Sequence, residues 1–458
     1  MIFDGPAIAK ATHGSLARGG PFGPVTTDSR RIPPGAWFVA LRGDRFDGHT
    51  FLAHAAAAGC AGAVVAADAA VPEGWSAGLV VVPDTLVALQ DLGRYAREIF
   101  TGPVVGITGS AGKTSTRVMV VDVLAEIGRV HHTQGNLNNH IGLPLTLCAT
   151  PPDAELLVLE MGMNHPGEIN LLQGIARPTV RLVTNVGAAH VEGCGSLDGV
   201  ARAKQELFDG AAPGDVLCVN DDDALVRAMP LPTGVQVVRY GSGAACPIRL
   251  TDVAVDAEAL RTRLRIETPD GVVRATLDVP GEHLARNALA AVAVGWALRV
   301  PVERMGPALA RFAPEGMRNR VERVDGVTIL NDAYNANPLS MAAALRTLAA
   351  LPGPRFAILG DMLELGDSEA DAHVEVLALA SALGIEHVWV TGDRMARAAI
   401  GTAVEVHPDV EHLCARLLPA LRRLPSPPGA SLLVKGSRGA RMERVVDLLR
   451  APRTHPGS

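Results

Sequence analysis

A short glycine-containing segment carries the residue types that bind a nucleoside triphosphate. An apolar run over residues 104–108 leads into Gly109-Ser110-Ala111-Gly112-Lys113-Thr114, and the residues that follow have a helical pattern. This order of strand, glycine-rich turn and helix is the context of a phosphate-binding loop. The backbone N–H groups and the dipole at a helix start attract anionic oxygen. Lys113 would reach the β- and γ-phosphates, and the Thr114 hydroxyl would face Mg²⁺.

The spacing of this segment leaves two interpretations open. The general phosphate-loop pattern has four residues between its first glycine and the Gly-Lys pair. Here two residues separate Gly109 from Gly112, and five separate Gly106 from Gly112. The alternative is a glycine-rich turn between a strand and a helix, followed by a surface lysine. The strand–turn–helix order favours phosphate binding.

Three other side chains are candidates for metal or phosphate chemistry. Glu160 ends an apolar strand, and open parallel sheets bind ligands outside the carboxyl ends of their strands. Its carboxylate is therefore placed to ligate Mg²⁺, although an exposed strand-end glutamate is the alternative. His190 follows the next strand in a Gly/Ala loop, where a lone histidine is more often structural. Lys204 lies in a helical segment, and because an ammonium repels Mg²⁺, its residue type alone indicates a solvated lysine.

Amide and cationic side chains are concentrated in three further loops. Residues 135–144 contain Asn136, Asn138 and Asn139. This density of amides suggests hydrogen bonding to a polar ligand, with turn formation as the alternative. Two later loops directly follow apolar strands, so we expect them on a ligand-facing edge. Their polar residues are Asp332 and Asn335 in the first loop, and Lys435, Ser437 and Arg438 in the second.

The elements that must position these loops alternate between strands and helices. The central strand candidates are residues 104–108, 156–160, 181–186 and 216–220, and the helix candidates are 114–127, 197–208 and 283–298. This alternation predicts a mostly parallel sheet with helices on both faces. Alternating residues over 236–280 predict an antiparallel flank. A second unit of this type has strand candidates at 327–330, 356–359, 388–390 and 432–434.

We therefore predict an α/β protein of three domains. Residues 1–98 would form a small α/β domain, with strands at 36–41 and 79–82 and helices at 54–60 and 85–99. Residues 99–313 would form the central P-loop-type domain, and residues 314–458 a Rossmann-like C-terminal domain. Thr101-Gly102-Pro103 is a plausible linker between the first two.

Composition limits the class of protein. Hydrophobic residues make up 48% of the 458 residues and aromatic residues only 3%, so the cores must be aliphatic. The net charge of −6 argues against a nucleic acid as main partner. Six scattered cysteines without a CxxC pair indicate a reducing cytosol rather than a disulfide framework. We expect no signal peptide and no membrane span, because neither pattern occurs in the sequence.

Together these segments resemble the Mur ligases, ATP-dependent amide-forming enzymes of peptidoglycan precursor synthesis. The resemblance spans nearly the whole chain. The family loop G-x-x-G-K-[ST] fits Gly109 to Thr114, which accounts for the unusual spacing. The other matching segments are residues 27–30, 34–41, 47–49, 135–139, 185–190, 332–338, 359–366 and 435–439, together with the helix around Lys204. The asparagine loop and residues 332–338 favour the member that adds D-alanyl-D-alanine.

The resemblance also implies roles for individual residues. It assigns Ser29 and Arg30 to the UDP-sugar end of the precursor, and the asparagine loop with Asn335, Lys435, Ser437 and Arg438 to substrate binding. It assigns ATP binding to Thr108, Gly109, Ser110, Ala111, Gly112, Lys113, Thr114, Asn287, Arg318 and Asp332, with Arg320 as an alternative to Arg318. Thr114 and Glu160 would bind one Mg²⁺, and His190 and a CO₂-carbamylated Lys204 a second. Catalysis would depend on Lys113, Glu160, His190 and Lys204.

The implied reaction is the ligation of D-alanyl-D-alanine to UDP-N-acetylmuramoyl-tripeptide through an acyl phosphate, in a cytoplasmic and monomeric enzyme. The alternatives are another Mur-type or folylpolyglutamate-type ligase, which would share Lys113, Glu160, His190 and Lys204, and a P-loop switch that forms no amide bond. The sequence does not distinguish lysine from diaminopimelate as the third residue of the peptide.

Overall fold

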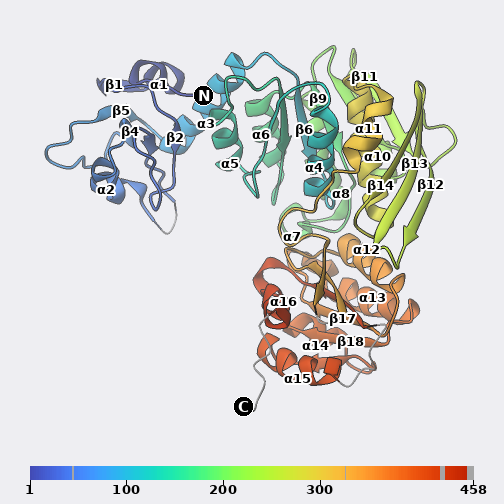
Figure 1. The fold of residues 1–458 in the computed structure, drawn as a ribbon. Coiled ribbons are helices and arrows are strands. Elements are labelled where there is room, and N and C mark those ends of the chain that lie inside the picture. The colour runs from blue at the N-terminus through green and yellow to red at the C-terminus, as the bar shows by residue number, and fades with distance from the viewer. Residues whose placement is uncertain (44–45, 325, 423–428, 451–458) are drawn as a thin grey trace.

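The computed structural model describes residues 1–43, 46–324, 326–422 and 429–450, whose strands form three separate sheets. Figure 1 shows that the first sheet and its helices lie to one side of the central sheet, and that the third sheet lies below it. The N-terminus lies near the junction of the first two units. The α/β fold class is confirmed.

The first sheet has five strands in the order β1-β5-β4-β3-β2, and only the β1–β5 pairing is antiparallel. The strands are β1 (Ser15–Arg18), β2 (Val25–Thr26), β3 (Trp37–Val39), β4 (Gly62–Ala66) and β5 (Gly78–Val82). The helices are α1 (Gly5–Thr12), η1 (Gly48–Phe51), α2 (Leu52–Ala57) and α3 (Thr85–Ile99). Helix α3 begins where the Asp84 carboxylate accepts from the N–H groups of Leu86 and Val87.

The central sheet has nine strands in the order β14-β13-β12-β11-β10-β9-β6-β8-β7. Strands β6 to β12 pair in parallel, and β12 to β14 form an antiparallel flank. The strands are β6 (Val104–Thr108), β7 (Val130–His132), β8 (Leu156–Glu160), β9 (Val180–Val183), β10 (Val216–Asn220), β11 (Gln236–Gly241), β12 (Ile248–Asp256), β13 (Arg261–Thr268) and β14 (Gly271–Leu277). Because β6 is flanked by β8 and β9, the loops after these three strands meet at one edge.

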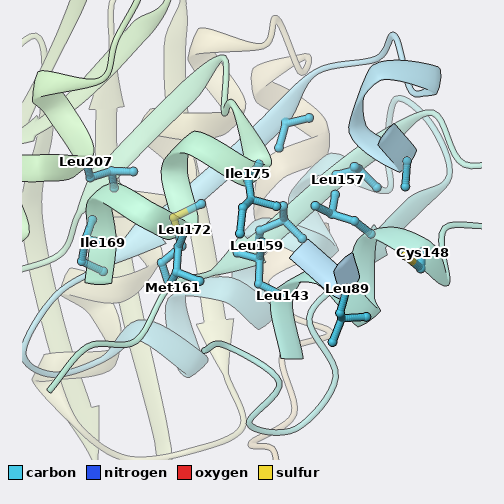
Figure 2. Packing of buried hydrophobic residues seen from close by; sticks show 14 of the residues in the cluster. Leu89, Leu143, Cys148, Leu157, Leu159, Met161, Ile169, Leu172, Ile175 and Leu207 are labelled. Atoms are coloured by element: carbon cyan, nitrogen blue, oxygen red, sulfur yellow. The ribbon is translucent and has the colours of Figure 1, made fainter. Parts of the chain in front are cut away.

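Helices cover both faces of the central sheet. They are α4 (Lys113–Leu124), α5 (Gly142–Cys148), α6 (Glu168–Ala176), α7 (Val191–Cys194), α8 (Leu197–Asp209), α9 (Ala224–Arg227), α10 (Glu282–Ala297) and α11 (Val302–Leu309). Helices α4, α10 and α11 share one aliphatic core with the sheet. On the other face, α5, α6 and α8 pack with α3 of the first unit, and Figure 2 shows Leu143, Leu159, Leu172 and Leu89 in that core. Helix α3 therefore joins the first unit to the central one.

The third sheet has six strands in the order β15-β16-β20-β17-β18-β19. The strands are β15 (Arg320–Val324), β16 (Val327–Asp332), β17 (Arg355–Gly360), β18 (His387–Thr391), β19 (Glu405–His407) and β20 (Ser431–Lys435). The helices are α12 (Pro338–Ala349), η2 (Gly366–Ser368), α13 (Glu369–Ala382), α14 (Asp393–Ala398), α15 (Val410–Arg422), η3 (Arg438–Ala440) and α16 (Glu443–Arg450). Strand β20, the last in the chain, lies between β16 and β17 and pairs with both in parallel.

The predicted strands and helices differ from the observed ones mainly at their ends. The strand predicted over residues 181–186 ends at Val183, because Thr184 and Asn185 turn toward the phosphate loop and hydrogen bond to Ala111. The predicted helix over residues 54–60 ends at Ala57, before Gly59 takes a positive φ of 71°. Six strands were not predicted: β1, β2, β4, β7, β15 and β19. All but β4, which is a short apolar run, depend on pairing with neighbouring strands rather than on a run of apolar residues.

Candidate active site

A polar cleft of about 780 Å³ lies between the central and third units. This volume is in the range of ligand-binding clefts. The predicted site residues that line it are Ser110, Ala111, Gly112, Lys113, Thr114, Asn136, Asn138, Asn139, Glu160, His190, Asn287, Arg318, Asp332, Asn335, Lys435, Ser437 and Arg438. Residues more than 300 positions apart in the chain therefore come together in one place.

Five predicted site residues are not among the described residues that line this cleft. Thr108 is fully buried, and its hydroxyl donates to the Met161 carbonyl at 2.9 Å, while Gly109, at the start of the loop, is also buried. Lys204 is buried behind the cleft. Ser29 and Arg30 lie in the first unit, where the Arg30 guanidinium pairs with Asp28 at 2.9 Å and lowers the pKa of that carboxyl to about 2.

The phosphate loop has a backbone that requires glycine. Gly112 has a φ of 77° directly before α4, and a Cβ on it would lie 2.7 Å from the Asn287 amide oxygen. A Cβ on Gly109 would lie 1.9 Å from the Thr184 hydroxyl. Such close approach and positive φ are accessible to glycine without steric cost. The first turn of α4 thereby presents its N–H groups to the cleft, as anion binding requires.

Asn185 holds the phosphate loop in shape, and the sequence analysis did not include it among the site residues. Its side-chain oxygen accepts from the Ala111 N–H at 2.9 Å, and its amide group donates to the Ala111 carbonyl at 3.0 Å. Its backbone carbonyl accepts from Ser110 N–H at 3.0 Å. The Lys113 ammonium bonds to the Gly109 carbonyl at 2.6 Å, across the loop. Burial lowers the pKa of Lys113, and the Glu160 carboxylate opposes that shift.

Glu160 is the buried anion of the cleft, with an exposed fraction of 1%. One carboxylate oxygen accepts from the Thr114 hydroxyl at 3.0 Å, and the other from the Asn138 amide at 2.8 Å. The asparagine loop therefore has two functions in this structure. Asn138 binds Glu160, whereas Asn139 accepts from the N–H groups of Ile141 and Gly142 at the start of α5, which is turn chemistry.

Arg117 is a second residue that sequence reasoning missed. Its guanidinium is completely buried, lies 3.4 Å from the Glu160 carboxylate and forms an ion pair with Glu315. Another of its nitrogens lies 2.8 Å from His132 Nδ1. Glu315 precedes β15, in the segment that connects the central and third units. A chain of charges thus runs from the metal-binding candidate Glu160 to the interdomain connection.

His190 and Lys204 occupy different environments. His190 Nδ1 lies 2.6 Å from the carboxylate of Glu364, a residue of the third unit, and this contact lowers the pKa of Glu364. Lys204 is 1% exposed, and among the described residues its ammonium has no hydrogen-bond or ion-pair partner. Burial, with a smaller contribution from the Lys113 ammonium, lowers the pKa of Lys204 well below its usual range. The prediction from residue type alone, that Lys204 is a solvated lysine, is therefore wrong.

The third unit contributes a buried ion pair and an arginine that stacks on a tyrosine ring. Lys435, also 1% exposed, donates to the Asp332 carboxylate and, at 2.8 Å, to the Asn335 carbonyl. Arg318 stacks on the Tyr334 ring, with its guanidinium carbon 3.5 Å from the ring centroid. Arg320 is exposed, pairs with Glu322 at 3.4 Å and is outside the described lining, so the geometry favours Arg318.

The remaining predicted residues of the third unit are tied to neighbouring loops. Ser437 Oγ accepts from the Leu363 N–H at 3.0 Å, and the Arg438 guanidinium pairs with Glu443 at 2.9 Å. Within the described residues there is no cluster of three or more His, Cys, Asp or Glu side chains that could hold a metal by themselves. Mg²⁺ usually binds through one or two carboxylates together with substrate phosphates, so the Thr114–Glu160 pair beside a phosphate loop fits this ion.

Comparison with known proteins gives consistent matches along the chain. Residues 107–295 match the Mur ligase middle domain, residues 318–438 the Mur ligase glutamate ligase domain, and residues 23–97 the Mur ligase family catalytic domain. UDP-N-acetylmuramoyl-tripeptide--D-alanyl-D-alanine ligase of Escherichia coli K12 is 37% identical over 434 residues, covering 93% of both chains. The chain belongs to the Mur ligase family. The Bacillus subtilis protein of the same name is 38% identical, again over 93% of both chains.

The structure of this Mur ligase is similar to several solved structures. A crystal structure of MurF from Acinetobacter baumannii matches with a TM-score of 0.90 and 30% identity, covering 98% of this chain and 99% of that one. MurF from Thermotoga maritima, solved in complex with ADP, matches with a TM-score of 0.82 and 28% identity, covering 93% and 97%. Folylpolyglutamate synthase of Mycobacterium tuberculosis shares the fold, with a TM-score of 0.64 at 18% identity.

We predict that Arg117→Met destabilises this Mur ligase strongly. Removing one partner of a buried ion pair typically costs about 3–5 kcal/mol, because the remaining charge is left without compensation. The matched control is Arg129→Met, since Arg129 is exposed and pairs with Asp153 at 3.3 Å, and exposed pairs contribute about 0–1 kcal/mol. Calorimetric melting of both variants is the measurement. Equal melting temperatures would contradict the buried network.

Proposed function

We propose that this chain joins D-alanyl-D-alanine to UDP-N-acetylmuramoyl-tripeptide at the expense of ATP, in peptidoglycan precursor synthesis. Relatives with that name are 37% and 38% identical over 93% of this chain. The observation that carries the proposal is the composition of the cleft. A phosphate loop and the buried Glu160 lie on one side, and Arg318, Lys435 and Arg438 lie on the other. This arrangement suits two anionic substrates, a triphosphate and a carboxylate.

We assign phosphate binding to the loop of residues 108–114 and one Mg²⁺ to Thr114 and Glu160. The two side chains are 3.0 Å apart at the start of α4, where the phosphates of ATP would lie. When bound, Mg²⁺ neutralises phosphate charge that would otherwise repel the substrate carboxylate. Lys113 supplies a fixed positive charge at the same place, and Asn138 holds the other oxygen of Glu160 at 2.8 Å. Asn287, Arg318 and Asp332 are our candidates for the nucleoside end.

We assign a second Mg²⁺ to His190 and a carbamylated Lys204. The lowered pKa of Lys204 favours the uncharged amine, which is the form that adds to CO₂. Its nitrogen lone pair forms a bond to the carbon of CO₂, and the nitrogen releases a proton to give an anionic carbamate. Burial of an unpaired ammonium is costly, so conversion to an anionic metal ligand explains both the burial of Lys204 and its missing partner.

The reaction then has two covalent steps. The terminal carboxylate of the tripeptide attacks the γ-phosphorus of ATP, ADP leaves, and an acyl phosphate forms. The amine of D-alanyl-D-alanine attacks the acyl carbon, and the tetrahedral intermediate collapses to an amide and inorganic phosphate, with loss of a proton from nitrogen. Lys113 and Arg318 stabilise the negative charge that accumulates. Lys435, Ser437, Arg438, Asn136, Asn139 and Asn335 are our candidates for holding the peptide substrates.

The first domain is proposed to bind the UDP-sugar through Ser29 and Arg30. Because these residues lie outside the cleft lining, the extended precursor must span from the first domain to Glu160. We keep residues 1–98, 99–313 and 314–458 as the proposed domain boundaries. No helix among the described residues is long and apolar enough to cross a membrane, and the six cysteines are all free. We expect the enzyme in the cytosol, as a monomer.

A phosphate-release assay tests the proposed reaction directly. Phosphate should be released rapidly only when ATP, UDP-N-acetylmuramoyl-tripeptide and D-alanyl-D-alanine are all present, because the acyl phosphate is protected until an amine arrives. A panel of tripeptides ending in lysine or diaminopimelate, and of other amine acceptors, defines the substrate. Phosphate release at the same rate with and without the dipeptide would indicate a nucleotide switch instead.

Lys113→Ala should abolish ligation and leave the fold intact. Lys113 contacts the loop carbonyl of Gly109 and no apolar core, so its loss removes charge stabilisation. Removing one such preorganised group typically costs about 10²–10³ in rate. Turnover is measured together with circular dichroism. A well-folded variant with near-native turnover would refute the assignment of this loop.

Lys204→Ala should be nearly inactive, and short carboxylic acids should partly restore it by replacing the carbamate oxygens. Wild-type activity should also fall in CO₂-depleted buffer and return with bicarbonate. The control for a solvated lysine is Lys10→Ala, since Lys10 is an exposed residue of α1; its replacement should alter stability by no more than about 0.5 kcal/mol. Normal turnover of Lys204→Ala at saturating Mg²⁺ would exclude the carbamate.

A further inference from the structure

One loop of the third domain reaches the central domain beside His190. The loop follows β17 and contains Glu364, whose carboxylate lies 2.6 Å from His190 Nδ1. The Glu192 N–H donates to the Glu364 backbone carbonyl at 3.3 Å, and a Cβ on Gly366 would lie 3.3 Å from the Glu192 backbone. Glu364 is therefore held at this interface through its backbone as well as its side chain.

Both partners of this contact have an uncommon backbone conformation. His190 has a φ of 60° and a ψ of 27°, and Glu364 has a φ of 63°. Few non-glycine residues adopt left-handed geometry, and each instance costs free energy that the surrounding structure must supply. Such residues are concentrated at functional sites. Two such residues in contact across a domain boundary indicate that the surrounding structure holds the pair in a specific position.

The contact at Nδ1 determines which nitrogen of the His190 imidazole can bind a metal. With Nδ1 bound to the Glu364 carboxylate, the proton of a neutral ring lies on Nδ1, and Nε2 keeps its lone pair. Metal-binding histidines almost always donate their other ring N–H to such an acceptor, which fixes the tautomer and raises the basicity of the ligand. His190 lines the cleft, and Nε2 is the ring nitrogen that the contact with Glu364 leaves without a proton.

We propose that Glu364 is the positioning residue for His190, so that the second metal site is completed only when the third domain contacts the central one. The inference rests on the proposed function, in which His190 binds the second Mg²⁺. His190 and Lys204 belong to the central domain and Glu364 to the third. Two other contacts form the same interface. The Asn337 amide donates to the Ser110 carbonyl at 3.1 Å, and Leu339 packs against Gly187.

An ordinary interdomain ion pair is the alternative. The Glu364 side chain is 52% exposed, and exposed pairs usually contribute about 0–1 kcal/mol to stability. In that case replacing Glu364 would slightly change the contact between the domains and leave metal binding unaffected. If Glu364 positions His190, replacing Glu364 should instead weaken binding of the second metal strongly and change stability little.

The test is a Mn²⁺ titration followed by electron paramagnetic resonance. The full-length enzyme carries a non-hydrolysable ATP analogue and UDP-N-acetylmuramoyl-tripeptide, without the dipeptide. We expect two bound Mn²⁺ in the wild type. In Glu364→Ala the weaker site should lose about 10–100-fold in affinity, as for other outer ligands of metal-binding histidines, and the tighter site should be unchanged. Glu364→Gln keeps an acceptor oxygen for Nδ1–H and should lose less.

Two controls separate positioning from a structural role. Asp367→Ala changes an exposed acidic residue of the same loop that lies outside the cleft lining, and it should bind both Mn²⁺ ions as the wild type does. Adding Glu364→Ala to His190→Ala should have no further effect, because Glu364 acts through His190. In steady-state kinetics, Glu364→Ala should lower kcat, require more Mg²⁺ and keep the KM for ATP.

The possible failures are distinguishable. One Mn²⁺ in the wild type would overturn the two-metal part of the proposed function, and this inference with it. Two Mn²⁺ with unchanged affinities in a folded Glu364→Ala variant would overturn the inference alone. An equal loss in Asp367→Ala, or an additive loss in the double variant, would also overturn it, because the effect would then not pass through His190.

Discussion

The burial of the Glu160 carboxylate is the constraint on which the site depends. A buried charge is tolerated only with partners, and Glu160 obtains them from Thr114 at the start of α4, from Asn138 and from Arg117. Thr114 and Arg117 belong to α4 and Asn138 belongs to the loop before α5, so satisfying one carboxylate fixes this helix and this loop relative to the end of β8. The parallel pairing of β6 with β8 places the anion beside the phosphate loop before any ligand arrives. The geometry that we propose to bind Mg²⁺ is therefore largely preorganised.

The same carboxylate is connected to the third domain. Arg117 pairs with Glu315, which lies in the connection to β15, while the Asn337–Ser110 and His190–Glu364 contacts join the domains on the other side of the phosphate loop. The proposed phosphate loop and the elements that carry Lys435 and Arg438 are thus coupled through hydrogen bonds and ion pairs, not through a continuous apolar core. Polar interfaces of this kind permit domains to separate and reassociate, which a ligase with large substrates requires.

The sequence predicted the elements whose signals are local. The glycine-rich loop, the strands that end at Thr108 and Glu160 and the helix from Thr85 to Ile99 follow from glycine spacing, apolar runs and a helical pattern. The α/β class and the family were confirmed, while the roles of the site residues stay predictions. Arg117, Asn185 and Glu364 could not be found in this way, because the partners that place them in the site, Glu160, Ala111 and His190 respectively, lie 43 or more residues away and only the fold brings them together. Lys204 shows the same limit, since no local pattern distinguishes a buried helix lysine from a solvated one.

The place of β20 in the third sheet has a consequence for biosynthesis. Among the strands of the described residues, β20 is translated last, yet it lies between β16 and β17 and hydrogen bonds to both. Until the ribosome has made residues 431–435, the nascent third domain exposes two apolar strands with unpaired edges, a state prone to aggregation. In the central sheet the corresponding wait is shorter, because β6 has both of its neighbours, β8 and β9, by residue 183. The enzyme is therefore expected to complete its cleft only after β20 has been made, and the interval between synthesis of β17 and β20 is when holdase chaperones have their main opportunity to act on the third domain.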